Sequence, residues 1–196
     1  MINIFLSASV PLPNRDRRFF DTADVLAIRE ATKALVEVVL PVGRITCGGH
    51  PAITPLLALF VRDAGLCQDR VTIFQSALFE GRMPVDLADF VDVRVIPAVG
   101  TDREASLTVM REEMVTSQHF EAAVIIGGME GVLEEMDLFV RHNPSAIVLP
   151  LASTGAAAAI IHENGCYDEE LVSELTFPSL FRRKLPLLEE LRELGL

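Results

Sequence analysis

The sequence is short of basic residues. Its 196 residues contain 17 Lys and Arg against 28 Asp and Glu, which gives a formal net charge of −11. Proteins bind duplex DNA and anionic membranes through clusters of Lys and Arg. We therefore expect neither duplex nucleic acid nor a membrane as a partner. A small anionic ligand remains possible, because backbone amides can bind it locally.

Cysteines and long apolar runs are also scarce. The three cysteines, Cys47, Cys67 and Cys166, are scattered, and no CxxC or Cys/His cluster suggests a metal site. Such a pattern fits a reducing compartment. No apolar run reaches about 18 residues, and the N-terminus lacks the basic and apolar segments of a signal peptide. We expect a soluble, cytoplasmic protein without a bound metal.

Two common nucleotide-binding motifs are absent. The sequence has neither GxGxxG after its first apolar segment nor GxxxxGK[ST] anywhere. These absences argue against a standard NAD dehydrogenase and a P-loop NTPase, and we expect no cofactor.

Short apolar segments alternate with helical patterns along the chain. The expected strands are residues 2–8, 43–46, 71–74, 91–96, 122–126 and 146–149. This alternation predicts an α/β, Rossmann-like, doubly wound and mostly parallel sheet of about six strands, with helices on both faces. We expect one domain over residues 1–196, in which residues 168–196 form peripheral helices broken at Pro178 and Pro186. The 91–96 strand alternates apolar and charged residues, so it should lie near an edge.

The most informative loops each follow an expected strand. In a doubly wound sheet, a ligand binds outside the carboxyl ends of the strands, where the strand order reverses. Two Gly-Gly turns stand between a strand and a helix, where free amides can hold a phosphate. Pro51 suits the first turn of the helix that follows Gly48 and Gly49. Residues 79–84 could cover a pocket as a flap. The expected ligand-binding positions in the four loops are Ser7, Ala8, Ser9, Gly48, Gly49, His50, Pro51, Gly127, Gly128, Met129, Glu130, Gly131, Ser153 and Thr154.

Several side chains have both a structural and a functional interpretation. Glu134 and Glu135 fall in the first turn of a helix expected from Val132, where acids complement the helix dipole, or one could face a ribose. Arg111 is either a surface residue paired with nearby acids or a bidentate anion ligand. His50 is a polar turn residue or a donor to a phosphate or base. The basic patch at residues 15–18 balances nearby acids or reaches a phosphate.

Residues 111–135 resemble the Lonely-guy family of phosphoribohydrolases. That family carries an arginine in one helix, then a strand, then P-G-G-x-G-T-x-x-E. Arg111 stands sixteen residues before Gly127, and the glycines and final glutamate of the pattern match Gly127, Gly128, Gly131 and Glu135. The sequence departs from the pattern in three ways: Ile126 replaces the proline, Val132 replaces the threonine, and Met129 or Glu130 is an extra loop residue.

The turn G-G-H-P-A-I-T-P resembles instead the wider SLOG superfamily, which also includes ligand-sensing members. That resemblance implies sensing of nucleotide-derived signals, such as relatives of cyclic ADP-ribose, in bacterial conflict systems. It further implies a homo-oligomer, a dimer or tetramer, and is compatible with a separate effector protein.

Three functions follow as expectations. The first is binding or sensing of an ADP-ribose-like nucleotide without hydrolysis, which the losses at Ile126 and Val132 favour. The alternative is hydrolysis of the N-glycosidic bond of a nucleoside 5′-monophosphate, with Glu135 and Arg111 as catalytic residues. The third is a scaffold or oligomerisation module with a vestigial pocket. Whether the protein is an enzyme stays open.

Overall fold

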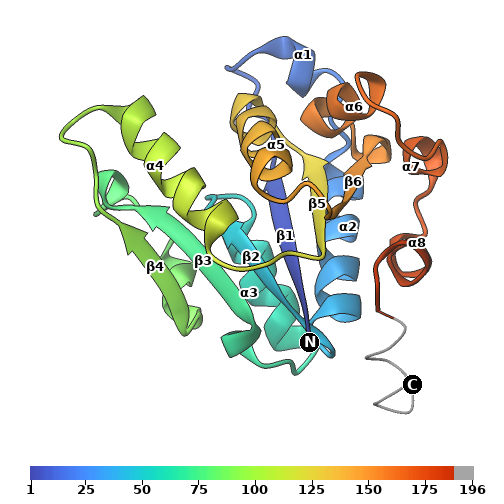
Figure 1. Ribbon diagram of the computed structural model, residues 1–196, viewed down its shortest axis with the longest axis horizontal. Coiled ribbons are helices and arrows are strands. Elements are labelled where there is room, and N and C mark those ends of the chain that lie inside the picture. The colour runs from blue at the N-terminus through green and yellow to red at the C-terminus, as the bar shows by residue number, and fades with distance from the viewer. Residues whose placement is uncertain (188–196) are drawn as a thin grey trace.

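Six parallel strands form one sheet in the order β4-β3-β2-β1-β5-β6 (Figure 1). The computed structural model describes residues 1–187. The sheet confirms the predicted α/β, Rossmann-like, doubly wound fold, and β4 lies at an edge as its pattern predicts. The strands are β1 Ile2–Ser9, β2 Gly43–Gly48, β3 Val71–Ser76, β4 Asp92–Ile96, β5 Ala122–Gly127 and β6 Ile147–Leu151.

Helices cover both faces of the sheet (Figure 1). Helices α2, α3 and α8 pack on one face, and α4, α5 and α6 on the other. The α-helices are α1 Arg17–Phe20, α2 Val25–Val39, α3 Thr54–Asp63, α4 Arg103–Thr116, α5 Glu130–His142, α6 Ala156–Glu163, α7 Glu170–Ser173 and α8 Phe177–Lys184. Short 3-10 helices are η1 Gln68–Arg70, η2 Ala77–Phe79, η3 Val85–Asp89 and η4 Ala152–Thr154.

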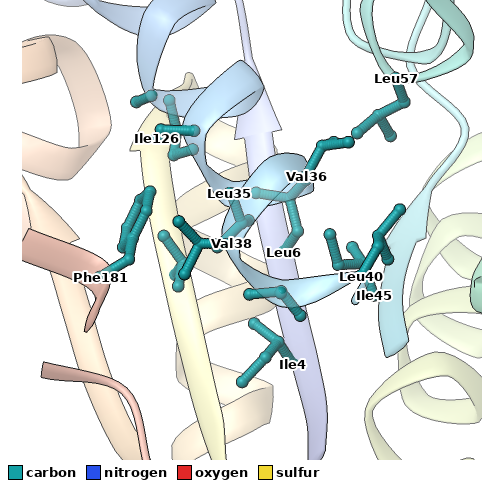
Figure 2. Packing of buried hydrophobic residues seen from close by; sticks show 14 of the residues in the cluster. Ile4, Leu6, Leu35, Val36, Val38, Leu40, Ile45, Leu57, Ile126 and Phe181 are labelled. Atoms are coloured by element: carbon teal, nitrogen blue, oxygen red, sulfur yellow. The ribbon is translucent and has the colours of Figure 1, made fainter. Parts of the chain in front are cut away.

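Helix α2 forms the centre of the first apolar layer. Its apolar residues recur at helical spacing, and Asp24 caps its N-terminus through the side chain. Leu35 and Val36 are fully buried. Figure 2 shows α2 along β1, with Phe181 of α8 at one side and Leu57 of α3 at the other.

Three phenylalanines fix α5 on the opposite face. The rings of Phe5 in β1 and Phe139 in α5 stack at 4.9 Å between centroids. Phe120 lies 5.7 Å from each of them, and all three are fully buried. Helix α5 is therefore packed directly against the central strand.

The strand order reverses between β1 and β5. Strand β1 pairs with β2 on one side, where Leu6 lies opposite Cys47, and with β5 on the other, where Ser9 lies opposite Gly127. The chain leaves β1 toward the face of α2 and leaves β5 toward the face of α5. Their carboxyl ends thus form the crevice in which doubly wound sheets bind ligands.

Two helices begin at other residues than the sequence predicts. Helix α5 begins at Glu130, not Val132, so Glu134 and Glu135 lie in its second turn. Helix α3 begins at Thr54 and not at Pro51, because the Thr54 hydroxyl accepts the His50 N–H and closes a turn first.

The C-terminal segment differs in part from its prediction. Pro178 lies in the first turn of α8 and does not break a helix. Helix α8 buries Phe177, Leu180 and Phe181 against the layer of α2. The part of the predicted terminal helices in 188–196 lies outside the described residues. Within residues 1–187, no helix is long and apolar enough to cross a membrane.

Candidate functional site

A cavity of about 570 Å³ opens at the carboxyl ends of β1, β2 and β5. This volume is in the range of about 300–1,000 Å³ typical of small-molecule sites. The cavity lies where the strand order reverses. Eleven residues expected from the sequence line it, namely Ala8, Ser9, Gly48, Gly49, His50, Pro51, Arg111, Met129, Glu130, Gly131 and Glu135.

The turn at Gly127 and Gly128 is buried behind the cavity and does not line it. Gly128 has φ +101°, and a Cβ atom there would lie 2.6 Å from a methyl carbon of Val132. The Gly127 amide donates to Thr154 Oγ1 over 2.8 Å, and the Gly128 amide donates to the Ser9 carbonyl over 2.9 Å. The expectation that these two amides hold a phosphate is therefore corrected, because both already donate within the protein.

The free amides come next in the chain. The N–H groups of Met129, Glu130 and Gly131 donate to no protein acceptor in the part of the chain that the structure describes. They stand at the start of the 13-residue helix α5, whose N-terminus carries about half a positive charge. All three residues line the cavity. The glycine turn thus positions the anion-binding amides but does not supply them.

The amides of the other glycine turn, at Gly48 and Gly49, also donate within the protein. The Gly49 amide donates to the Phe74 carbonyl over 2.8 Å, and the His50 amide donates to Thr54 Oγ1 over 3.1 Å. This turn therefore gives the cavity its wall and the His50 side chain, and its amides are not available to a phosphate.

Arg111 lies between two carboxylates. Its side chain is 9% exposed, pairs with Glu134 through Nη1, and places Nε 3.7 Å from Glu135 Oε1. The Nε atom is buried without a hydrogen-bond partner. A Cβ atom on Gly131 would lie 2.8 Å from Arg111 Nη2, so a side chain at this position would displace the guanidinium. The structure brings together three of the residues that carry the resemblance to the Lonely-guy family: Arg111, Gly131 and Glu135.

Ser7 acts on the site through Glu135. Ser7 Oγ donates to Glu135 Oε2 over 2.5 Å, although Ser7 itself does not line the cavity. Burial raises the pKa of Glu135 above its ordinary value, while the Ser7 hydrogen bond and Arg111 oppose the rise.

Burial, with a smaller contribution from Glu135, raises the pKa of Cys47 to about 12, so its thiol is neutral. Cys47 is a core residue.

His50 is a neutral side chain at the cavity wall. Its Nδ1 atom accepts from the Ala52 amide over 3.2 Å, which places the ring proton on Nε2. Burial lowers the pKa of His50 to about 4. The ring can therefore donate one hydrogen bond at neutral pH, but it carries no charge.

Ser153 and Thr154 lie outside the cavity. Thr154 Oγ1 donates to the Leu151 carbonyl over 2.6 Å and accepts the Gly127 amide, so it supports the glycine turn from behind. Ser153 Oγ is buried without a hydrogen-bond partner in the described residues. Neither hydroxyl lines the cavity.

Arginines surround the cavity mouth. Arg15 and Arg82 line it, and both are exposed. Of the basic patch, Arg17 pairs with Asp21 and Arg18 with Asp16, and neither of these two arginines lines the cavity. Phe79, Arg82 and Pro84 place the 79–84 loop at this mouth, where the sequence suggests a flap.

Sequence reasoning missed Gln75 and Arg103, which also line the cavity. Gln75 follows an apolar strand run, and its Nε2 atom bonds the Gly49 carbonyl over 3.4 Å. Arg103 begins α4, directly after Asp102, whose side chain caps the helix. Their positions near the end of β3 and at the start of α4, at the same sheet edge as the other loops, were the available signals. Residues 1–187 contain no group of three or more His, Cys, Asp or Glu that could hold a metal ion.

Comparison with known proteins agrees with this geometry. The model of the SLOG cluster3 family matches residues 18–185. The X-ray structure of TM1055, a structural genomics target, superposes with a TM-score of 0.55 at 16% identity, covering 88% of this chain and 89% of that one. The comparison with curated proteins found no match. The TM1055 likeness shows the fold, and the family match supports a nucleotide-binding Rossmann-like domain. We conclude that this chain belongs to the SLOG cluster3 family.

Proposed function

We propose that the cavity binds an ADP-ribose-like or cyclic ADP-ribose-like nucleotide and that the protein acts as a sensor of this ligand. The observation that carries the proposal is the meeting, in one cavity, of three free amides at the start of α5 with the buried Nε of Arg111, which has no hydrogen-bond partner. Amides at a helix start and an arginine are two independent features that favour a phosphate.

The ligand phosphate lies against the amides of Met129, Glu130 and Gly131 in this proposal. Arg111 supplies the buried positive charge. At the mouth, Arg15 and Arg82 have no ion pair with any described residue and can meet a second phosphate. A ligand with a diphosphate uses both positions.

The sugar and base contact Glu135 and His50 in this proposal. Glu135, held by Ser7, accepts from ribose hydroxyls, as carboxylates do in dinucleotide sites. His50 Nε2 donates to an acceptor on the base or on a phosphate. His50 adds no charge to the binding of the sugar and base, because its ring is neutral.

Isothermal titration calorimetry against AMP, ADP-ribose and cyclic ADP-ribose isomers tests the proposal. We expect at least one of these ligands to bind wild-type protein and to bind Arg111→Met and Gly131→Ala more weakly. Asp137→Asn, on the same helix but outside the cavity, is the matched control and keeps wild-type affinity. Absence of binding by every ligand would contradict the proposal.

A sensor must pass its signal on. We propose that ligand binding acts through a homo-oligomer, a dimer or tetramer, and a separate effector in a bacterial conflict system. Analytical ultracentrifugation with and without ADP-ribose tests the assembly, and a monomer under both conditions would contradict it.

One observation favours an alternative, an N-glycosidase acting on a nucleoside 5′-monophosphate. Arg111 Nε and Glu135 Oε1 are 3.7 Å apart in the cavity, where both could face the sugar. Glu135 would then stabilise the positive charge that develops on the ribose. Chromatography for free base after incubation with nucleoside monophosphates tests this function. Release of free base by wild-type protein, and its loss in Glu135→Ala, would favour the N-glycosidase over the sensor.

A further inference from the structure

An acidic side chain of the protein itself is already paired with the guanidinium of Arg111. Glu134 accepts from Arg111 Nη1, and both residues line the cavity. The free amides of Met129 to Gly131 begin the same helix one turn before Glu134. A Cβ atom on Gly131 would lie 2.8 Å from Arg111 Nη2, so a phosphate on these amides would meet the same guanidinium that Glu134 now holds through Nη1.

The two carboxylates beside Arg111 differ in how firmly they are held. The Glu135 side chain is 15% exposed and is held by Ser7. The Glu134 side chain is 50% exposed, and within residues 1–187 Arg111 is its one hydrogen-bond partner. Glu134 can therefore rotate into solvent, while Glu135 stays in place.

We propose that Glu134 is a built-in competitor that the phosphate of the ligand must displace from Arg111; this inference rests on the proposed function. Two anions cannot share one guanidinium at close range without repulsion. The apparent affinity is then the intrinsic affinity multiplied by the fraction of the protein in which Arg111 is free of Glu134. The site consequently selects phosphate groups, which can bond the amides and Arg111 together, over weaker anions such as carboxylates.

Glu134→Gln removes the competing charge and keeps the size of the side chain. We expect it to tighten the binding of pyrophosphate and of ADP-ribose at least about fivefold, the lower end of the range for coupled sites. Asp137→Asn removes an equal charge one turn away on α5, outside the cavity, and should leave both affinities unchanged. In an Arg111→Met background, Glu134→Gln should no longer tighten binding.

Calorimetry on wild-type protein and these four variants separates the outcomes. If wild-type protein binds ADP-ribose and Glu134→Gln does not bind it more tightly, the competitor is refuted and the proposed function stands. Weaker binding by Glu134→Gln also refutes it and makes Glu134 a ligand contact. If wild-type protein binds no nucleotide while Glu134→Gln binds pyrophosphate, Glu134 is a competitor as proposed, and the proposed nucleotide ligand is wrong. Absence of binding throughout, in proteins that unfold cooperatively on heating, overturns both.

Discussion

The guanidinium of Arg111 occupies the space that a side chain at Gly131 would fill. A Cβ atom on Gly131 would lie 2.8 Å from Arg111 Nη2. Gly131 belongs to α5 and Arg111 to α4, so the missing side chain sets how closely the arginine approaches the helix that bears the free amides.

Gly131→Ala should therefore separate binding from stability. Alanine favours a helix over glycine by up to about 1 kcal/mol, so the free energy of unfolding should stay within about 1 kcal/mol of wild type. Affinity for ADP-ribose should fall about tenfold or more, the scale of one charge-assisted hydrogen bond. Urea unfolding and calorimetry measure the two effects. Unchanged affinity would show that the position of Arg111 does not matter for binding.

Gly128→Ala, unlike Gly131→Ala, should act mainly on stability. Gly128 has φ +101° and its Cβ would meet Val132, so alanine should lower the free energy of unfolding by about 1–3 kcal/mol or more. For the same reason Gly128→Asp should disturb folding, so it cannot be used to block the anion site. Chemical unfolding of Gly128→Ala checks this. Wild-type stability would mean that the turn relaxes without strain.

Glu135 should make stability depend on pH. Because burial raises its pKa, folded protein keeps the proton at pH values where the unfolded chain has lost it. The free energy of unfolding should therefore fall as pH rises from the ordinary value of 4.5 through the raised pKa of the folded protein. Glu135→Gln cannot ionise and lacks this fall. Urea unfolding of both proteins from about pH 4 to pH 8 measures the difference. A difference that does not change with pH would show that the pKa is not raised.

His50 should titrate near pH 4. Its lowered pKa means that the unfolded chain binds more protons between about 4 and the ordinary value of 6.5, so this residue adds stability as pH rises through that window. Proton NMR of the imidazole should give a midpoint of about 4. A midpoint near 6.5 would show an exposed ring and would remove the argument for a neutral donor.

Much of the fold follows from the sequence because each signal is local. Six short apolar runs separated by helical patterns predict the strands, and the alternation in β4 predicts its edge position. The start of α5 was harder to predict, since Met129 supplies no side-chain cap and Glu130 begins the helix without an apolar signal.

The site follows less fully because hydrogen bonds between distant residues decide it. The sequence identifies Gly127 and Gly128, but it cannot show that Thr154 and the Ser9 carbonyl accept their amides. The pairing of Arg111 with Glu134 links α4 to α5, and no local pattern encodes it.

The central claim is that a nucleotide phosphate binds at the start of α5. The most direct measurement is a backbone-amide NMR titration of ¹⁵N-labelled protein with ADP-ribose. We predict the largest shifts at Met129, Glu130 and Gly131, with a smaller shift at His50. Shifts that are absent there, or that centre on the groove between α5 and α6 around Tyr167, would contradict the account.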